Sequence, residues 1–229
     1  MTNNKSKVSK NTHIYILLDR SGSMSSIAND VIGGFNKYVS DQQKNGPDAK
    51  VTFVQFDSQD SQEVIVAGAS ITEIVQLDGS TFVPRGGTPL LDATGLLIGR
   101  ARVEAAAREA TGLPKQDIIF VTITDGEENQ STEYTLPQIK KLFKECEAAG
   151  WTFAFISAAL DAYGDAQRIG VKHGNIQSFD KSARGTRLAF ESLSQKTSEF
   201  RNKKRSGLAA ENDEFFGSDK PAEDDRNNN

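Results

Sequence analysis

Short apolar runs rich in Ile, Val and Phe alternate along the chain with longer segments in which apolar residues recur at helical spacing. Runs such as Ile14–Leu18 and Ile118–Ile123 are apolar apart from Thr122, which is typical of strands that are covered on both faces. Strands that alternate with helices predict an α/β fold with a mostly parallel sheet. This pattern constrains the fold more than any other feature of the sequence.

The boundaries of the expected elements follow from the ends of these runs. Six segments are expected to form strands: His13–Asp19, Lys50–Phe56, Glu63–Ala67, Asp117–Thr124, Trp151–Ser157 and Asn175–Phe179. Five segments are expected to form helices: Ile27–Val39, Leu90–Ala110, Leu136–Ala149, Asp161–Gly170 and Ser182–Arg201. Residues 57–62 are too few for a helical crossover, so we expect one antiparallel edge strand after them. The sequence thus predicts a Rossmann-like, three-layer αβα sandwich around a sheet of about six strands.

Composition is that of an ordinary globular protein, with 25% charged and 37% hydrophobic residues. No apolar stretch approaches the roughly 20 residues that a membrane span needs. The first ten residues include Lys5, Lys7 and Lys10 and lack the apolar core of a secretion signal. The single cysteine, Cys146, excludes an internal disulfide. We therefore expect a cytoplasmic protein.

Three regions are expected: a flexible N-terminus at 1–10, a folded domain at 11–205, and an acidic, disordered tail at 206–229. Residues 211–229 hold seven acidic and two basic residues, and the whole chain has a net charge of −4. The body is therefore nearly neutral, and we expect no nucleic-acid partner. Within the tail, Phe215-Phe216 could be a docking motif, and the basic stretch Lys196–Arg205 could receive the tail; plain surface roles stay open for both.

Five oxygen-bearing residues follow predicted strands or start a helix. Asp19, Ser21 and Ser23 form the pattern Asp-x-Ser-x-Ser after the first strand, Thr88 lies in Gly-Gly-Thr-Pro-Leu, and Asp125 lies in Thr-Asp-Gly after the fourth strand. In the common strand order 3-2-1-4-5-6 the two aspartates would be neighbours at the carboxyl edge of the sheet. Adjacent carboxylates repel one another, and a hard cation such as Mg²⁺ prefers oxygen ligands. The motifs therefore predict a metal site.

These residues, in this order, resemble the metal-ion-dependent adhesion site of the von Willebrand factor A-type (vWA) domain family. The resemblance spans about residues 11–201 and implies that Ser21, Ser23 and Thr88 bind Mg²⁺ (or Mn²⁺) directly. Asp19 and Asp125 would then act largely through water. The resemblance also implies a protein–protein interaction module that binds an Asp or Glu of a partner through the metal. The chain looks more like intracellular bacterial or phage members, including tellurium-resistance-associated ones, than like integrins.

Two other interpretations stay open. Ser, Thr and Asp also cap helices and form turns, so the chain could be a metal-free scaffold that binds through another surface. A metal-dependent hydrolase is less favoured, because no phosphate-binding glycine motif is present and neither His13 nor His173 is placed as a general base. We expect no enzymatic activity, no catalytic residue and no membrane partner.

Residues next to the motifs also have expected roles. Arg20 is expected either to steer an acidic ligand or to be exposed. Glu127, Glu128 and Asn129 are expected to ring the site, where they would select the partner or solvate a loop. Cys146 is expected in the core.

Overall fold

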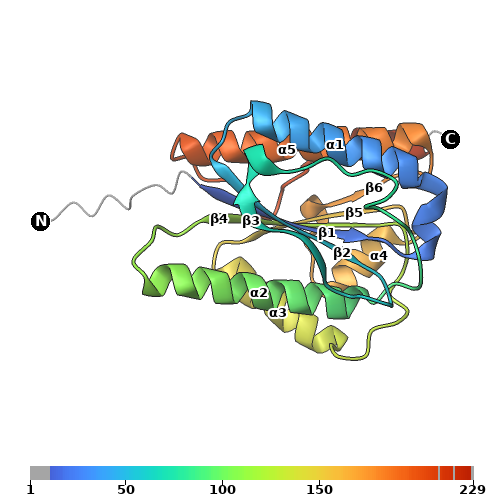
Figure 1. Ribbon diagram of the computed structural model, residues 1–229, viewed down its shortest axis with the longest axis horizontal. Coiled ribbons are helices and arrows are strands. Elements are labelled where there is room, and N and C mark those ends of the chain that lie inside the picture. Colours follow the sequence, from blue (N-terminus) through green and yellow to red (C-terminus); the bar gives the residue numbers. More distant parts are fainter. Residues whose placement is uncertain (1–10, 211, 219, 228–229) are drawn as a thin grey trace, which may run out of the picture.

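The computed structural model describes residues 11–210, 212–218 and 220–227, which form a sheet between two layers of helices (Figure 1). The strands are β1 (Thr12–Asp19), β2 (Ala49–Phe56), β3 (Glu63–Ser70), β4 (Asp117–Thr124), β5 (Thr152–Ser157) and β6 (Ile176–Ser178). The α-helices are α1 (Ala28–Lys44), α2 (Leu90–Ala110), α3 (Leu136–Ala148), α4 (Ala162–Ile169), α5 (Ala183–Arg205) and α6 (Pro221–Asn227); the 3₁₀-helices are η1 (Gly22–Ile27), η2 (Ile71–Glu73) and η3 (His173–Asn175). In the described part of the chain, no helix has the length and apolar character that crossing a membrane requires.

The sheet has the order β3-β2-β1-β4-β5-β6. β1 lies between β2 and β4 and is parallel to both, while β3 pairs with β2 in the antiparallel direction. The predicted mostly parallel sheet with one antiparallel edge strand is therefore confirmed. The order reverses at β1 and β4, which places the ends of these two strands where open α/β sheets bind ligands.

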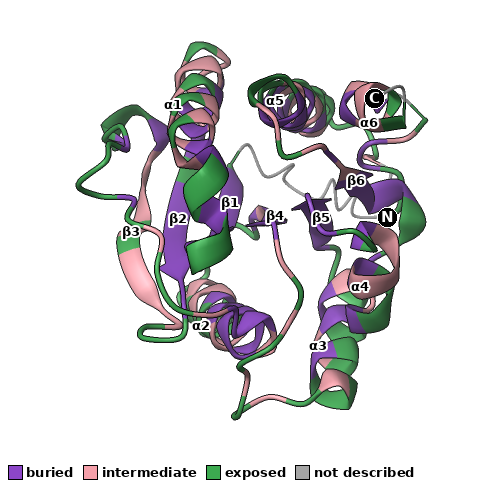
Figure 2. Ribbon diagram, turned by 90° about the vertical axis from the view of Figure 1, so that its right-hand side faces the viewer, coloured by how far each residue is buried: buried purple, intermediate pink, exposed green. Residues whose placement is uncertain are grey.

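Successive side chains of β1 enter two separate cores, because side chains alternate across a strand. Ile14, Ile16 and Leu18 pack in the core that α1 and α5 cover, whereas Tyr15 and Leu17 pack in the core that α2 and α3 cover. Figure 2 shows the sheet between these two helical layers. Covering both faces explains why the central strands are mainly apolar, with buried polar residues such as Thr52 and Thr122 as exceptions.

Two helices continue beyond the ends that the apolar pattern predicts. α1 ends at Lys44 instead of Val39, and α5 ends at Arg205 instead of Arg201. The extra turns are stabilised by buried polar contacts: Gln42 donates to the backbone oxygen of Ser194 at 2.9 Å, and Arg201 donates to the backbone oxygen of Gln42 at 2.8 Å. The spacing of apolar residues cannot predict helix turns that buried polar contacts of this kind stabilise.

The basic stretch at the end of α5 pairs with the sheet edge rather than with the tail. Arg201 and Arg205 both contact Asp48, and Lys204 contacts Asp117 at 3.1 Å. The idea that this stretch receives the acidic tail is therefore wrong for these residues.

The C-terminal segment packs on the domain, which differs from the expectation of a disordered tail. Phe216 is fully buried and Phe215 is 7% exposed. The amide of Phe216 donates to the backbone oxygen of Gly174 at 2.9 Å, and Glu223 of α6 accepts from the Tyr163 hydroxyl and from the backbone of Ser178. The two aromatic rings bury enough apolar surface to anchor a segment whose average composition is acidic.

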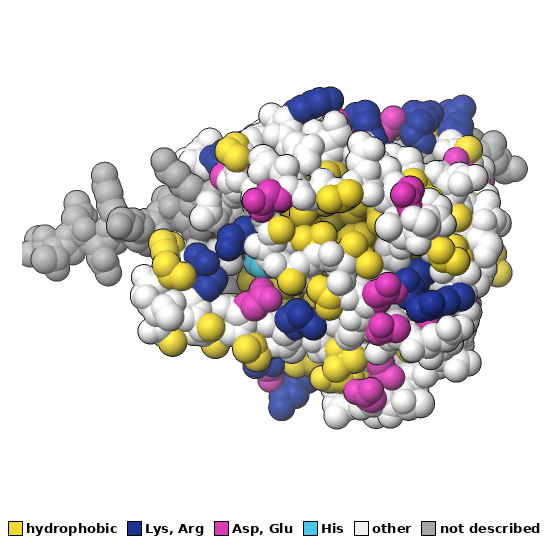
Figure 3. Space-filling model, in the orientation of Figure 1, with side chains coloured by type: hydrophobic (Ala, Val, Ile, Leu, Met, Phe, Trp, Pro, Cys, Tyr) yellow, Lys and Arg dark blue, Asp and Glu magenta, His cyan; other side chains and the backbone are white. Residues whose placement is uncertain are grey.

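Charge is mixed on the face of the molecule that Figure 3 shows. Basic and acidic side chains are interspersed there around a central apolar area. That face therefore carries no basic patch of the kind that binds nucleic acid.

Replacing Phe216 by alanine should lower the free energy of unfolding by about 3–5 kcal/mol, because a fully buried ring is removed from the core. Leu208→Ala is the matched control, since Leu208 is 61% exposed and should cost little. Urea unfolding followed by circular dichroism measures both. Equal midpoints for the two variants would show that the C-terminal segment does not pack on the domain.

Candidate metal centre

Asp19 and Asp125 lie at the same edge of the sheet, where the parallel strands end. β1 and β4 are hydrogen-bonded neighbours with Leu18 opposite Ile123, so the residues that follow these strands meet at one edge. Asp19 is fully buried and Asp125 is 2% exposed. The fold therefore holds two carboxyl groups away from water at the point where the strand order reverses.

The Asp19 carboxyl group is fixed by hydrogen bonds to both of its oxygens. Oδ1 accepts from the Ser21 amide at 2.7 Å, and Oδ2 accepts from the Thr124 hydroxyl at 2.6 Å. Burial raises the pKa of Asp19 to about 6, the hydrogen bonds from Thr124 and Ser21 oppose this rise, and the negative charge of Asp125 adds to it. A carboxylate that is costly to ionise in this way is stabilised by a nearby cation.

The two serines of the motif link Asp19 to Asp125. The hydroxyls of Ser21 and Ser23 are 3.0 Å apart, and the Ser23 hydroxyl donates to Asp125 Oδ1 at 2.6 Å. Gly22 allows the turn between them, because its amide donates to the Gly86 oxygen at 3.0 Å and a Cβ atom there would lie 3.3 Å from that oxygen. The loop after β1 is thus closely packed against the loop that carries Thr88.

Thr88 joins the same cluster from the start of α2. Its amide donates to the Asn129 side chain at 2.9 Å, and its backbone oxygen accepts from the Asn129 amide at 3.1 Å. A Cβ atom built on Gly126 would lie 3.5 Å from both the Thr88 and the Ser23 hydroxyl oxygens. The structure therefore brings all five predicted residues together at one edge; their role as metal ligands stays a prediction.

Arg20 points away from this cluster, and both roles expected for it are wrong. It is 4% exposed, and its guanidinium group donates twice to Asp57 Oδ2, at 2.6 and 2.9 Å. Arg85 contacts the same oxygen at 3.0 Å, and its amide donates to the Arg20 backbone oxygen at 2.8 Å. Arg20 therefore fixes the loop that leads to Thr88. Arg20 lies between Asp19 and Ser21, whose side chains point into the site, and successive side chains of an extended chain point in opposite directions. This alternation could have predicted that Arg20 points away from the site.

Two acidic side chains hold the loop after Asp125 against α2. Asp92 accepts three backbone hydrogen bonds from residues 132–134, at 2.7 to 2.9 Å. Glu128 accepts from the Ser131 hydroxyl at 2.6 Å and from the Leu91 amide at 2.8 Å. Glu128 and Asn129 thus anchor the loop, and their role in selecting a partner stays a prediction.

Lys181 is a site residue that the sequence analysis missed. Its ammonium group lies 3.0 Å from Asp125 Oδ2, an oxygen that is buried and accepts no hydrogen bond in the described part of the chain. Lys181 also lines a hollow of about 520 Å³ beside Asp125, together with Glu127 and Arg226. Lys181 follows β6, which ends at the same sheet edge as β1 and β4, and this position could have predicted that Lys181 lies near the site.

The donor set fits a hard divalent cation. Ser21, Ser23 and Thr88 offer neutral hydroxyl oxygens, and Asp19 and Asp125 offer carboxyl oxygens, which together are the ligands that Mg²⁺ and Mn²⁺ prefer. Among the described residues, no group of three or more His, Cys, Asp or Glu side chains is placed to hold a metal ion.

Without divalent cations, the contribution of Asp19 to stability should fall as pH rises from about 4 to about 6. Its pKa is raised in the folded protein, so the folded state binds this proton more tightly than the unfolded chain does. The difference in unfolding free energy between wild type and Asp19→Asn should therefore change by roughly 1–3 kcal/mol across this range. Urea unfolding in EDTA between pH 4 and 7 measures it. Parallel pH profiles for the two proteins would contradict the raised pKa.

The protein-family models and the curated protein sequences give no match to this chain. Solved structures do match this chain. The pilus adhesin SpaC from Lactobacillus rhamnosus GG aligns with a TM-score of 0.58 and 16% identity over 84% of this chain and 30% of SpaC. A manganese-loaded TRAP protein of Plasmodium vivax aligns with a TM-score of 0.52 and 15% identity over 76% of this chain and 70% of TRAP.

A von Willebrand factor type A structure from Catenulispora acidiphila aligns with a TM-score of 0.54 and 12% identity, over 82% of this chain and 43% of that one. The present chain thus spans about a third of SpaC and less than half of the Catenulispora protein. At these identities the similarity concerns the fold. The chain therefore has the fold of a von Willebrand factor A-type domain.

Proposed function

We propose that this protein is an interaction module that binds Mg²⁺ or Mn²⁺ at Asp19, Ser21, Ser23, Thr88 and Asp125 and, through the metal, an acidic residue of a protein partner. The observation that carries the proposal is the meeting of two buried carboxyl groups, Asp19 and Asp125, with the linked hydroxyls of Ser21 and Ser23 at one sheet edge. Two buried carboxylates side by side favour a cation between them.

The mixture of ligands supports binding of an anionic partner. Three of the five groups are neutral hydroxyls, so a bound cation would keep most of its positive charge and could accept a carboxylate from outside. Asp19 uses both oxygens in hydrogen bonds to its own loops, which leaves its role as one of orientation and charge. The chain's own residues thus shape the site without filling it with negative charge.

A hollow next to the site gives a partner room to approach. It is lined by Glu127, Lys181 and Arg226 among others, and Leu160 in its wall is 94% exposed. Arg226 also donates to the backbone oxygen of Ala159 at 3.1 Å, which ties the C-terminal helix to this wall. A partner segment with an acidic and an apolar residue would match these groups.

The position of the histidines favours binding over catalysis. His13 lies at the start of β1 and His173 lies in η3 before β6, so both are at the edge opposite the site. His13 is buried and bonds to the Thr52 hydroxyl at 2.9 Å, and burial lowers its pKa to about 4. Neither imidazole can exchange a proton with a ligand at Asp125.

Asp125→Asn should weaken binding of Mn²⁺ and Mg²⁺ by about 10- to 100-fold, because it removes the carboxylate that the site orients toward the cation. Titration calorimetry of wild type and variant measures this, with circular dichroism to verify the fold. Asp30→Asn, on α1 and outside the site, is the matched control and should bind as wild type does. If wild type and Asp125→Asn bound Mn²⁺ equally, the site assignment would be wrong.

A second candidate, a metal-free scaffold, is favoured by one observation. The Lys181 ammonium already neutralises Asp125, so the site can be stable without a metal. The two candidate functions assign opposite roles to Lys181. In the metal-dependent module it opposes the entry of a cation, whereas in the scaffold it is the permanent partner of Asp125.

Lys181→Met should therefore raise the affinity for Mn²⁺ about five-fold, equivalent to ~1 kcal/mol, because a competing and partly exposed ion pair is removed. Lys181→Arg should keep the competition, and Lys141→Met on the exposed side of α3 should change nothing. Calorimetric titration with Mn²⁺ measures all four proteins. Absence of Mn²⁺ binding in both wild type and Lys181→Met would support the scaffold.

A further inference from the structure

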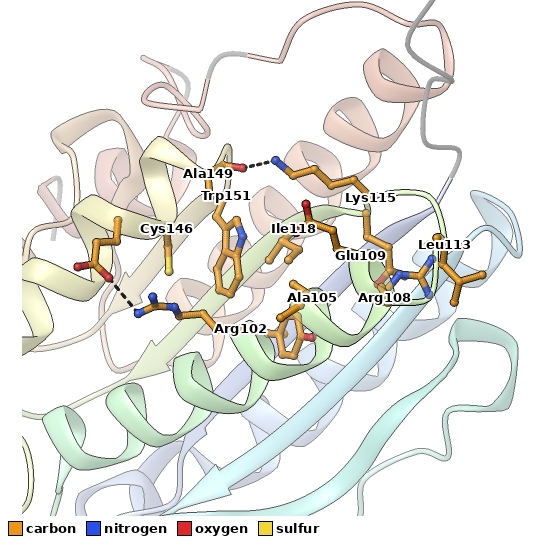
Figure 4. A pocket seen from close by; sticks show the side chains of 15 residues that line it. Arg102, Ala105, Arg108, Glu109, Leu113, Lys115, Ile118, Cys146, Ala149 and Trp151 are labelled. Atoms are coloured by element: carbon orange, nitrogen blue, oxygen red, sulfur yellow. Dashed lines mark hydrogen bonds and ion pairs between the residues drawn. The ribbon is translucent and has the colours of Figure 1, made fainter.

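A cavity of about 500 Å³ lies between the C-terminal halves of α2 and α3, next to the starts of β1, β4 and β5 (Figure 4). It is thus at the edge of the sheet opposite the candidate metal centre and shares no residue with it. Tyr15, Ile118, Cys146 and Trp151 are among the residues that line it. Cavities of roughly 300–1,000 Å³ with such apolar lining are the size that small molecules occupy.

Small residues line the cavity on the facing helices. Ala105 and Ala106 of α2 and Ala149 at the end of α3 are among them. The other half of α2 packs Leu97 and Ile98 fully into the core. A larger apolar side chain at Ala105 would occupy part of this space.

Two polar contacts close the mouth of the cavity. Arg102 of α2 pairs with Glu145 of α3 at 3.0 Å, and both side chains are about half exposed. Lys115 donates to the backbone oxygen of Ala149 at 2.6 Å. Exposed ion pairs contribute little stability, so a ligand can displace this closure at small cost.

The lining carries one more positive than negative charge, with Arg102, Arg108 and Lys115 against Glu109 and Glu145. Within the described residues, Arg108 and Lys115 form no ion pair, and their hydrogen bonds go to the backbone oxygens of Pro114 and Ala149. Arg102 is neutralised by Glu145, and Glu109 is the one remaining acid among the lining residues. An anionic group is therefore complementary to this rim.

We propose that this cavity binds a small aromatic carboxylic acid, with its ring beside Trp151 and its carboxylate toward Arg108 and Lys115. Trp151 is 4% exposed and Tyr15, whose ring is parallel to it, is 1% exposed, so the ligand would contact the accessible edge of Trp151 and the alanines around it. Binding is non-covalent, since burial raises the pKa of Cys146 to about 11 and keeps it a thiol.

The experiment uses 1-naphthoate as the probe and 1-naphthalenemethanol as its neutral counterpart. Trp151 is the only tryptophan, so quenching of its fluorescence reports binding at this cavity. Wild type should bind 1-naphthoate about ten-fold more tightly than the alcohol, because a charge-assisted contact is lost with the carboxylate. Equal affinities, or no saturable quenching by 1-naphthoate, would overturn the proposal.

Matched variants separate the cavity from the surface around it. Ala105→Leu places a larger side chain in the cavity and should weaken 1-naphthoate binding by about ten-fold, while Ala107→Leu, on the exposed side of the same helix, should not. Arg108→Gln should weaken 1-naphthoate but not the alcohol, with Arg100→Gln as the charge control. Should Ala105→Leu fail to fold, the Arg108 comparison decides. Unchanged binding in Arg108→Gln would overturn the assignment of the carboxylate.

Discussion

The candidate metal centre depends on the parallel register of β1 with β4. This register brings Asp19 and Asp125 to one edge and buries both, which is unfavourable for two negative charges. The surrounding contacts each lessen this cost: the Thr124 hydroxyl and the Ser21 amide donate to Asp19, and Ser23 and Lys181 contact Asp125. The loop contacts therefore reduce the free-energy cost of burying two carboxylates only in part. A divalent cation between them would reduce it further.

The loops that carry the site are fixed by buried polar side chains rather than by apolar packing. Arg20 and Asp57 hold the loop before Thr88, and Asp92 holds the loop after Asp125. Such networks are favourable only when nearly every group has a partner, and they then specify one geometry. A site built from hydroxyls needs this rigidity, because each hydroxyl is a weak ligand that must already point toward the metal.

Much of this arrangement follows from the sequence. Uninterrupted apolar runs predict buried parallel strands, and residues directly after such strands must meet at one edge, which places Asp19 and Asp125. The sequence analysis missed Lys181 and the role of Arg20, because both depend on which way a side chain leaves a loop. It also missed the packed C-terminal segment. Average composition there is acidic, yet Phe216 alone buries a complete ring, and a contact so distant along the chain leaves no local pattern.

The two edges of the sheet deviate from good packing in different ways. At the carboxyl edge the deviation is electrostatic, two buried carboxyl groups side by side; at the opposite edge it is steric, a cavity that small residues line. Proteins depart from local consistency mainly at functional positions. Tyr15 and Leu17 of β1 pack fully in the core between these edges. This packing offsets the destabilising effects of the buried carboxylates and of the cavity. The same strand thus runs between the two sites that we propose, one for a metal at its carboxyl end and one for an organic anion at its amino end.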